Sequence, residues 1–132
     1  MAAPNVSFNF TKLLVGDLDK TAAFYEAVFE LDRLAVVEDA IAGRQIREVM
    51  YKPTQEGGAT FVILSFLDAT SPIEGETITG FTVANLDDVL SKVKANGGSI
   101  ADPIRDMPHM GIRVAFARDN EGHLIEIVQM TA

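Results

Sequence analysis

The chain has 132 residues, of which 48% are apolar and 23% are charged, a composition typical of one folded globular domain. Eleven basic and nineteen acidic residues leave a net charge of −8, so no basic surface is available for phosphates and we expect no nucleic-acid partner. No apolar run reaches the ~18–20 residues that span a bilayer, and the N-terminus lacks a signal-peptide pattern. We therefore predict a cytoplasmic chain without a membrane partner. The absence of cysteine excludes disulfides and thiolate metal sites.

An internal repeat relates the two halves of the chain. After a shift of 68 positions, residues 10–20 align with residues 78–88, which places Thr11 on Thr79 and Val15 on Val83. The helix that follows would begin at the same place in both copies, because asparagine and aspartate are preferred N-cap residues. The two expected N-caps are Asp17 and Asn85. Two copies indicate a duplicated module rather than a solenoid.

In chain order, the pattern predicts a strand over 7–16 and then a helix after Asp17 with one apolar stripe. Three strands are expected over 33–39, 43–52 and 58–67, and residues 68–75 link the two copies. The second copy contains a strand over 76–84, a helix that Gly97 and Gly98 end, and strands over 99–105, 110–118 and 123–130. The order β-α-β-β-β thus occurs twice. We predict an α+β fold with halves at 7–67 and 76–130 of one domain spanning 1–132.

Several short motifs follow one another over nearly the whole chain. They are Val15-Gly16-Asp17-Leu18-Asp19, Phe24-Tyr25, Asn96-Gly97-Gly98 and an ending from Phe116 to Glu126 of the form F-x-x-D-x-x-G-x-x-x-E. In these motifs the sequence resembles the vicinal oxygen chelate superfamily, which includes glyoxalase I, extradiol dioxygenases and fosfomycin- and bleomycin-resistance proteins. The sequence departs from the family at Asn120, where proline is usual, and at Glu30, where glycine commonly closes the first helix.

The resemblance implies two βαβββ modules placed side by side, whose curved sheets form an open barrel around a ligand cleft. It also implies a homodimer, because members of the superfamily often complete their clefts by pairing chains. A small-molecule ligand is the expected partner of such a cleft.

Strand alternation predicts which side chains line the cleft. In the last strand Ile125 and Ile127 would pack against the helices, so Glu126 would point into the cleft between apolar neighbours. In the first strand Phe10, Lys12 and Leu14 would line the cleft. Through the repeat, Ile78 and Thr82 of the fifth strand would do the same.

The metal ligands of the superfamily are missing at three of the four positions that the resemblance implies. Phe10 and Ile78 stand where the family commonly has histidines, and Leu64 stands near the fourth-strand carboxylate. Only Glu126 remains, and one carboxylate is too few for a catalytic divalent ion, which usually needs about three protein ligands. We therefore expect no metal and no other cofactor.

Other polar residues are candidates for the site. His109 lies in the loop before the seventh strand, either as a surface residue or at the cleft mouth. Arg47 and Arg113 are candidates for substrate binding, although alternation does not decide which side chains of residues 44–51 face inward. His123 is expected to be a solvated turn residue. The predicted substrate-binding set is Phe10, Lys12, Leu14, Leu64, Ile78, Thr82, His109, Arg47 and Arg113, and Glu126 is the predicted catalytic residue.

Three functions are compatible with these residues. The first is a metal-independent, glyoxalase-like lyase or isomerase that acts on a small apolar carbonyl compound, with Glu126 moving a proton. The second is a bleomycin-resistance-type protein that sequesters a ligand without catalysis, for which the acidic surface would attract a cationic drug. The third is a non-catalytic accessory or ligand-sensing domain. We favour the enzyme, because a carboxylate in an apolar cleft is costly to retain.

Overall fold

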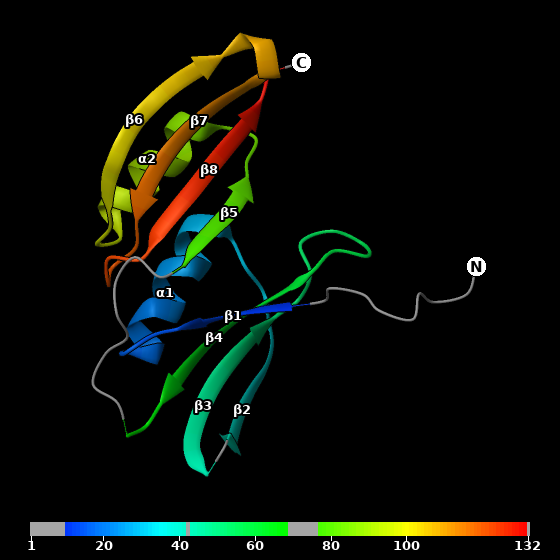
Figure 1. Cartoon of the computed structure of the whole chain (residues 1–132), viewed down its shortest axis with the longest axis vertical. Coiled ribbons are helices and arrows are strands. Elements are labelled where there is room, and N and C mark those ends of the chain that lie inside the picture. The colour runs from blue at the N-terminus through cyan, green and yellow to red at the C-terminus, as the bar shows by residue number, and fades with distance from the viewer. Residues whose placement is uncertain (1–9, 42, 69–76, 132) are drawn as a thin grey trace, which may run out of the picture.

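Two βαβββ modules follow one another in the computed structural model, which describes residues 10–41, 43–68 and 77–131 (Figure 1). The first module consists of β1 (Phe10–Leu14), α1 (Leu18–Phe29), β2 (Arg33–Ile41), β3 (Arg44–Tyr51) and β4 (Thr60–Phe66). The second consists of β5 (Ile78–Thr82), α2 (Leu86–Ala95), β6 (Ser99–Met107), the short 3₁₀ helix η1 (Pro108–Met110), β7 (Ile112–Arg118) and β8 (Leu124–Met130). The predicted order of elements is confirmed. Predictions for residues 7–9 and 76, and for most of the link, 69–75, lie outside the described residues.

Each module forms its own four-stranded mixed sheet. The strand orders are β1-β4-β3-β2 and β5-β8-β7-β6, so the two sheets have the same topology. In each sheet the first strand of the module runs parallel to the fourth, and the other neighbouring strands are antiparallel. No strand pairing joins the two sheets within the described ranges, so the α+β fold is confirmed as two open sheets without a closed barrel.

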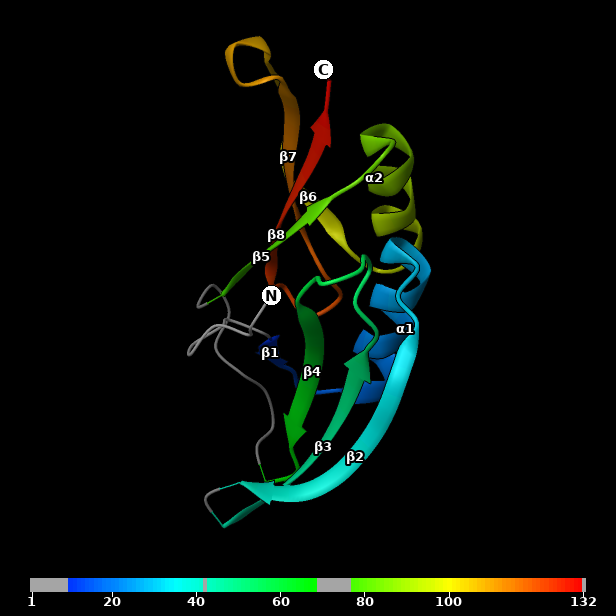
Figure 2. The same ribbon diagram turned by 90° about the vertical axis from the view of Figure 1, so that its right-hand side faces the viewer.

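One helix covers one face of each sheet, and the two helices lie one above the other along one side of the molecule in Figure 2. Both predicted N-caps are confirmed. The Asp17 carboxylate accepts from the Lys20 amide at 3.1 Å, and the Asn85 side chain accepts from the Asp88 amide at 3.0 Å. These bonds satisfy amides that the first helical turn leaves without partners. We call the covered face of each sheet the helix face and the opposite one the free face.

The repeat extends to a pair of ion-pair clusters on the helix faces. In the first module Arg47 of β3 lies 3.1 Å from Asp19 of α1 and 3.9 Å from Glu38 of β2. In the second module Arg113 of β7 lies 3.2 Å from Asp87 of α2 and 3.2 Å from Asp106 of β6. Each arginine therefore ties the start of its helix to the second strand of its module.

The hydrophobic core runs through both modules without a break, because aromatic side chains pack where α1 meets β5. The rings of Phe29 and Phe81 are stacked with centroids 3.9 Å apart, and Tyr25 lies 6.2 Å from Phe81. Phe61 of β4 completes this aromatic cluster at 5.8 Å from Phe81. The cluster joins the modules, since Tyr25, Phe29 and Phe61 come from the first and Phe81 from the second.

Glu30 adopts a left-handed backbone conformation, with φ 56° and ψ 38°, at the C-terminus of α1. A residue with a Cβ pays about 1–2 kcal/mol for this conformation, whereas glycine adopts it freely. We therefore expect Glu30→Gly to raise the free energy of unfolding by about 0.5–1 kcal/mol in urea titrations. The matched control is Gly97→Ala after α2, where φ is 91°. This change replaces a glycine in a left-handed conformation by a residue with a Cβ, so it should destabilise the protein. Loss of stability in Glu30→Gly would contradict this account.

Candidate functional site on the free faces

The free faces carry most of the predicted cleft residues. Strand pairing places Lys12 beside Val62 and Leu14 beside Leu64 in the first sheet. In the second sheet it places Ile78 beside Leu124 and Thr82 beside Val128. Ile125 and Ile127 are fully buried on the helix face, as alternation predicted, and this leaves Glu126 on the free face.

Glu126 lies half-buried in the middle of the second free face. Its neighbours along β8 are Leu124 and Val128, and across the sheet it lies between Gly80 and Phe116. A Cβ built on Gly80 would meet no atom within 4 Å, so the space beside Glu126 is open. Within the described ranges no ion pair ties up this carboxylate, and it remains available to a ligand.

The first free face contains an ion pair that the sequence did not reveal. The Lys12 ammonium lies 2.9 Å from the Glu48 carboxylate, and Glu48 is 6% exposed. Lys12 is on β1 and Glu48 on β3, so the pair crosses the intervening strand β4 beside Leu64. The orientation of Glu48 was left open by alternation, because residues 44–51 are polar on both faces.

Three of the predicted binding residues do not lie with the others on the free faces. Arg47 and Arg113 lie on the helix faces, where they bind Asp19 and Asp87, so their positions give no support to a role on the free faces. His109 is exposed in η1, at the end of the second module that lies farthest from the first in Figure 1. The remaining predicted residues lie on the free faces.

Two hollows occur on the described surface. One of about 460 Å³ lies at the start of α1, where the Glu121 carboxylate already accepts hydrogen bonds from the backbone amides of Gly16 and Asp17. The other, of about 710 Å³, lies between the end of α1 and β5 and includes Ile78 and Thr82. Neither hollow brings Lys12 and Glu126 together. Neither of these two hollows therefore joins the two free faces into one cleft.

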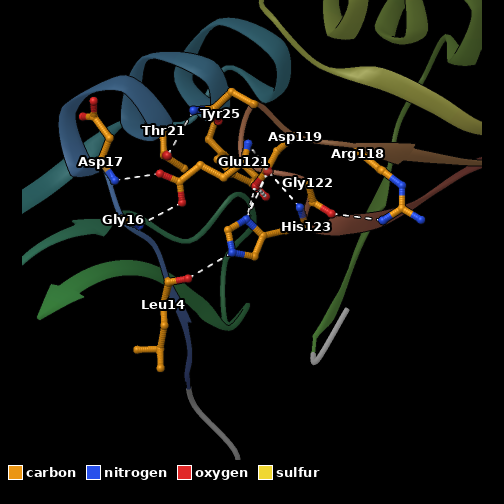
Figure 3. A network of polar contacts seen from close by, with 11 residues as sticks. Leu14, Gly16, Asp17, Thr21, Tyr25, Arg118, Asp119, Glu121, Gly122 and His123 are labelled. Carbon is orange, nitrogen blue, oxygen red and sulfur yellow. Dashed lines mark hydrogen bonds and ion pairs between the residues drawn. The ribbon is translucent and has the colours of Figure 1, made fainter. Parts of the chain in front are cut away.

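His123 was expected to be a solvated turn residue, and this prediction is wrong. His123 is 5% exposed, and it lies between two modules in a buried polar network (Figure 3). Its Nδ1 lies 2.9 Å from Asp119, and its Nε2 lies 3.0 Å from the carbonyl oxygen of Leu14. A hydrogen bond from the Tyr25 hydroxyl also reaches Asp119 at 2.9 Å. In the family ending Asp119 is a fixed position and His123 an unspecified one, so the motif carried no signal for the burial of His123.

Both ring nitrogens of His123 face oxygen acceptors, an arrangement that favours the doubly protonated imidazolium over either neutral tautomer. The hydrogen bond to Asp119 raises the pKa of His123, and this outweighs burial, which lowers it. For Asp119, burial raises the pKa, but the hydrogen bond and charge of His123 outweigh it and the pKa is lowered overall. Burial and the charge of Asp119 raise the pKa of Tyr25 well above its ordinary value, so it remains a donor.

The pH dependence of stability follows from the sign of the His123 shift. A group whose pKa is raised on folding stabilises the protein fully below its unfolded pKa, here 6.5, and this contribution disappears as pH rises through the folded value. We expect the free energy of unfolding to fall as pH increases above 6.5, as followed by urea denaturation. In His123→Gln this decrease should be reduced. An equally steep decrease in the variant would show that another group is responsible.

The free faces do not fit a divalent metal ion. No group of three or more His, Asp or Glu side chains able to share an ion occurs in residues 10–41, 43–68 and 77–131. Phe10 and Ile78 have no lone pair to donate, and Glu48, which pairs with Leu64 across the sheet, is already neutralised by Lys12. The donor set that the described residues offer on the free faces is therefore too small for a catalytic divalent ion. The expectation of a metal-free protein remains a prediction.

Two βαβββ modules with a helix on one face of each open sheet define a glyoxalase-like fold. The sequence model of the Glyoxalase/Bleomycin resistance protein/Dioxygenase superfamily matches residues 7–127, and the chain belongs to this superfamily. The predicted family is thus confirmed.

Individual relatives are distant. The chain is 26% identical over 122 residues to a probable lactoylglutathione lyase of Vibrio parahaemolyticus, covering 90% of this chain and 87% of that protein. A glyoxalase family protein of Bacillus cereus has a similar structure, with a TM-score of 0.84 at 17% identity over 100% of this chain and 99% of the other. A fosfomycin resistance protein of Listeria monocytogenes gives a TM-score of 0.68 at 19% identity, covering 94% and 93% of the two chains. These structural similarities establish the fold.

Among the described residues, no helix has the length and apolar character needed to cross a membrane.

Proposed function

We propose that this protein is a metal-independent, glyoxalase-like lyase or isomerase that acts on a small, largely apolar carbonyl compound. Glu126 is the proposed catalytic group, which takes a proton from carbon next to the carbonyl and returns it during the reaction. The supporting observation is its setting: a carboxylate without an ion pair in the described residues, among apolar side chains, beside the open space over Gly80. Removing a charged group from water is unfavourable, so its retention there favours a chemical role.

The same free faces carry the residues proposed to bind the substrate. Phe10 and Leu14 expose apolar surface in the first module, where Leu64 is buried, and Ile78 and Thr82 lie on the free face of the second. The distant relatives named probable lactoylglutathione lyase make a thioester of a small hydroxy acid a reasonable compound to test first.

The test follows proton exchange rather than one assumed product. The protein is incubated in D₂O with small 2-oxo compounds and with lactoylglutathione, and deuterium incorporation next to the carbonyl is measured by NMR. Glu126→Gln should lower the exchange rate by about 10²–10⁴-fold. The control is Glu38→Gln, which makes the same change at an exposed carboxylate of β2 and should retain the rate. Full exchange activity in Glu126→Gln would refute the assignment.

The metal prediction is tested in the same assay. Chelators should leave both exchange and thermal stability unchanged, and elemental analysis should find no stoichiometric zinc, nickel, iron or manganese. If elemental analysis found about one transition metal per chain, and Glu126→Gln lost it, the prediction would be wrong and the mechanism would depend on a metal.

The alternative is ligand sequestration without catalysis, as in the bleomycin-resistance type. Its support is the exposed apolar surface of the free faces, which suits binding regardless of chemistry. A tight complex with a small molecule, in which the ligand is recovered unchanged and Glu126→Gln binds equally well, would favour this function.

We further propose a homodimer and retain the predicted cytoplasmic location. The large apolar side chains on the free faces are exposed within one chain, with Phe10 at 56% and Ile78 at 59%. A second copy that covers these surfaces would enclose a cleft that one chain leaves open. Analytical ultracentrifugation should therefore detect a dimer at micromolar concentration, and Phe10→Asp should shift it toward the 14.3 kDa monomer. A wild-type monomer would contradict the proposal.

A further inference from the structure

The ion pair on the first free face is exposed at one end only. The side chain of Glu48 is 8% exposed and that of Lys12 is 33% exposed, although their charged atoms lie 2.9 Å apart. The carboxylate is therefore covered, while the ammonium reaches the surface where a ligand would lie. A pair with zero net charge thus presents its positive end to the free face.

The pairing also leaves hydrogen-bond donors available. A lysine ammonium has three N–H donors, and Glu48 accepts one of them at 2.9 Å. The ammonium is fixed at both sides, because it also lies 5.8 Å from the centre of the Phe10 ring. Its surroundings on β1 and β4 are apolar, namely Leu14, Val62 and Leu64. Low polarity strengthens the attraction between such an ammonium and an anion.

We propose that Lys12, held in place by Glu48, binds an anionic oxygen of the substrate, so that the ligand is a small carbonyl compound with a carboxylate. This inference rests on the proposed function and on the proposed homodimer, since Lys12 and Glu126 lie on the free faces of different sheets and a second copy would have to enclose the ligand. It also separates the enzyme from the sequestering alternative, because a positive group in the cleft opposes a cationic drug. Glu48 is a positioning residue, and Lys12 is the residue that contacts the ligand.

The test compares two probes that differ in charge. Binding of 2-oxobutyrate and of its neutral methyl ester is followed by NMR shifts of the protein, with calorimetry for affinity. The acid should bind at least about tenfold more tightly than the ester, since charge-assisted hydrogen bonds are the stronger ones. Its binding should weaken as salt increases, and the shifts should include the Lys12 side chain.

Variants assign the effect to Lys12. Lys12→Met should remove the preference for the acid, whereas Lys20→Met, the same change at an exposed lysine of α1, should preserve it. Lys12→Met leaves the Glu48 carboxylate buried without its partner, which threatens folding. The double variant Lys12→Met, Glu48→Gln leaves no buried charge and should also bind both probes equally.

Equal binding of acid and ester by the wild type would overturn the proposal. Failure of both probes to bind at concentrations up to about 10 mM, where weak ligands saturate, would do the same. So would a preference for the acid that survives in the double variant. These results are independent of the exchange assay on Glu126. If exchange fails while the acid preference holds, the proposed enzyme is wrong and the anion site stands. If exchange depends on Glu126 but the acid preference is absent, only the anion site is wrong.

Discussion

Replacing Asp119 with alanine is expected to lower the free energy of unfolding by about 3–5 kcal/mol, because the change leaves a buried charge without its partner. Asp119 is 3% exposed and accepts hydrogen bonds from Tyr25, from His123 and from the backbone amide of Glu121. Without the carboxylate, His123 must lose its proton or remain charged in an apolar setting. Urea titration at pH 6, just below the unfolded His123 pKa of 6.5, measures the loss.

A matched control separates this effect from the loss of an ordinary ion pair. Asp68→Ala removes an aspartate that binds Arg44 at the surface, and such exposed pairs contribute little to stability. The double variant Asp119→Ala, His123→Leu should lose less stability than the sum of the single changes, since it contains no buried histidine charge without a partner. A cost below about 1 kcal/mol for Asp119→Ala would contradict the account of the network.

The fold was predictable because its signals are local and occur twice. Asp17 and Asn85 cap their helices as expected, and alternation in β8 correctly separated Ile125 and Ile127 from Glu126. The arrangement of the two sheets was less predictable. It depends on contacts between modules, such as the stacking of Phe29 on Phe81, which no pattern within one strand or helix specifies.

The site was predictable only as far as alternation applies. It placed Lys12 and Glu126 on the free faces, but β3 is polar on both faces and gave no orientation for Arg47 or Glu48. His123 was misjudged for a different reason. Its position beside a turn predicts exposure, whereas here His123 is buried against β1 of the other module and Asp119 against Tyr25 of α1. Burial of that kind depends on residues 109 positions apart in the chain, from Leu14 to His123.

The aromatic cluster is expected to contribute strongly to the free energy of unfolding. Phe81 is the contribution of the second module to this cluster, and its ring contacts Phe29 and Phe61 of the first. Truncating a packed phenylalanine costs the transfer free energy of the ring and leaves a cavity. Aromatic pairs add about 0.5–1.5 kcal/mol beyond their buried area. The cost of losing Phe81 should therefore exceed that of losing a phenylalanine of similar burial outside the cluster.

We expect Phe81→Ala to lower the free energy of unfolding by about 3 kcal/mol, against about 1 kcal/mol for Phe116→Ala. Phe116 is also half-buried, but it lies on the free face of β7 and outside the aromatic cluster. Urea titration measures both losses, and backbone NMR signals of α1 show whether the first module responds to a change made in the second. Equal costs for the two variants, with α1 undisturbed by Phe81→Ala, would show that the modules are held together without the aromatic cluster.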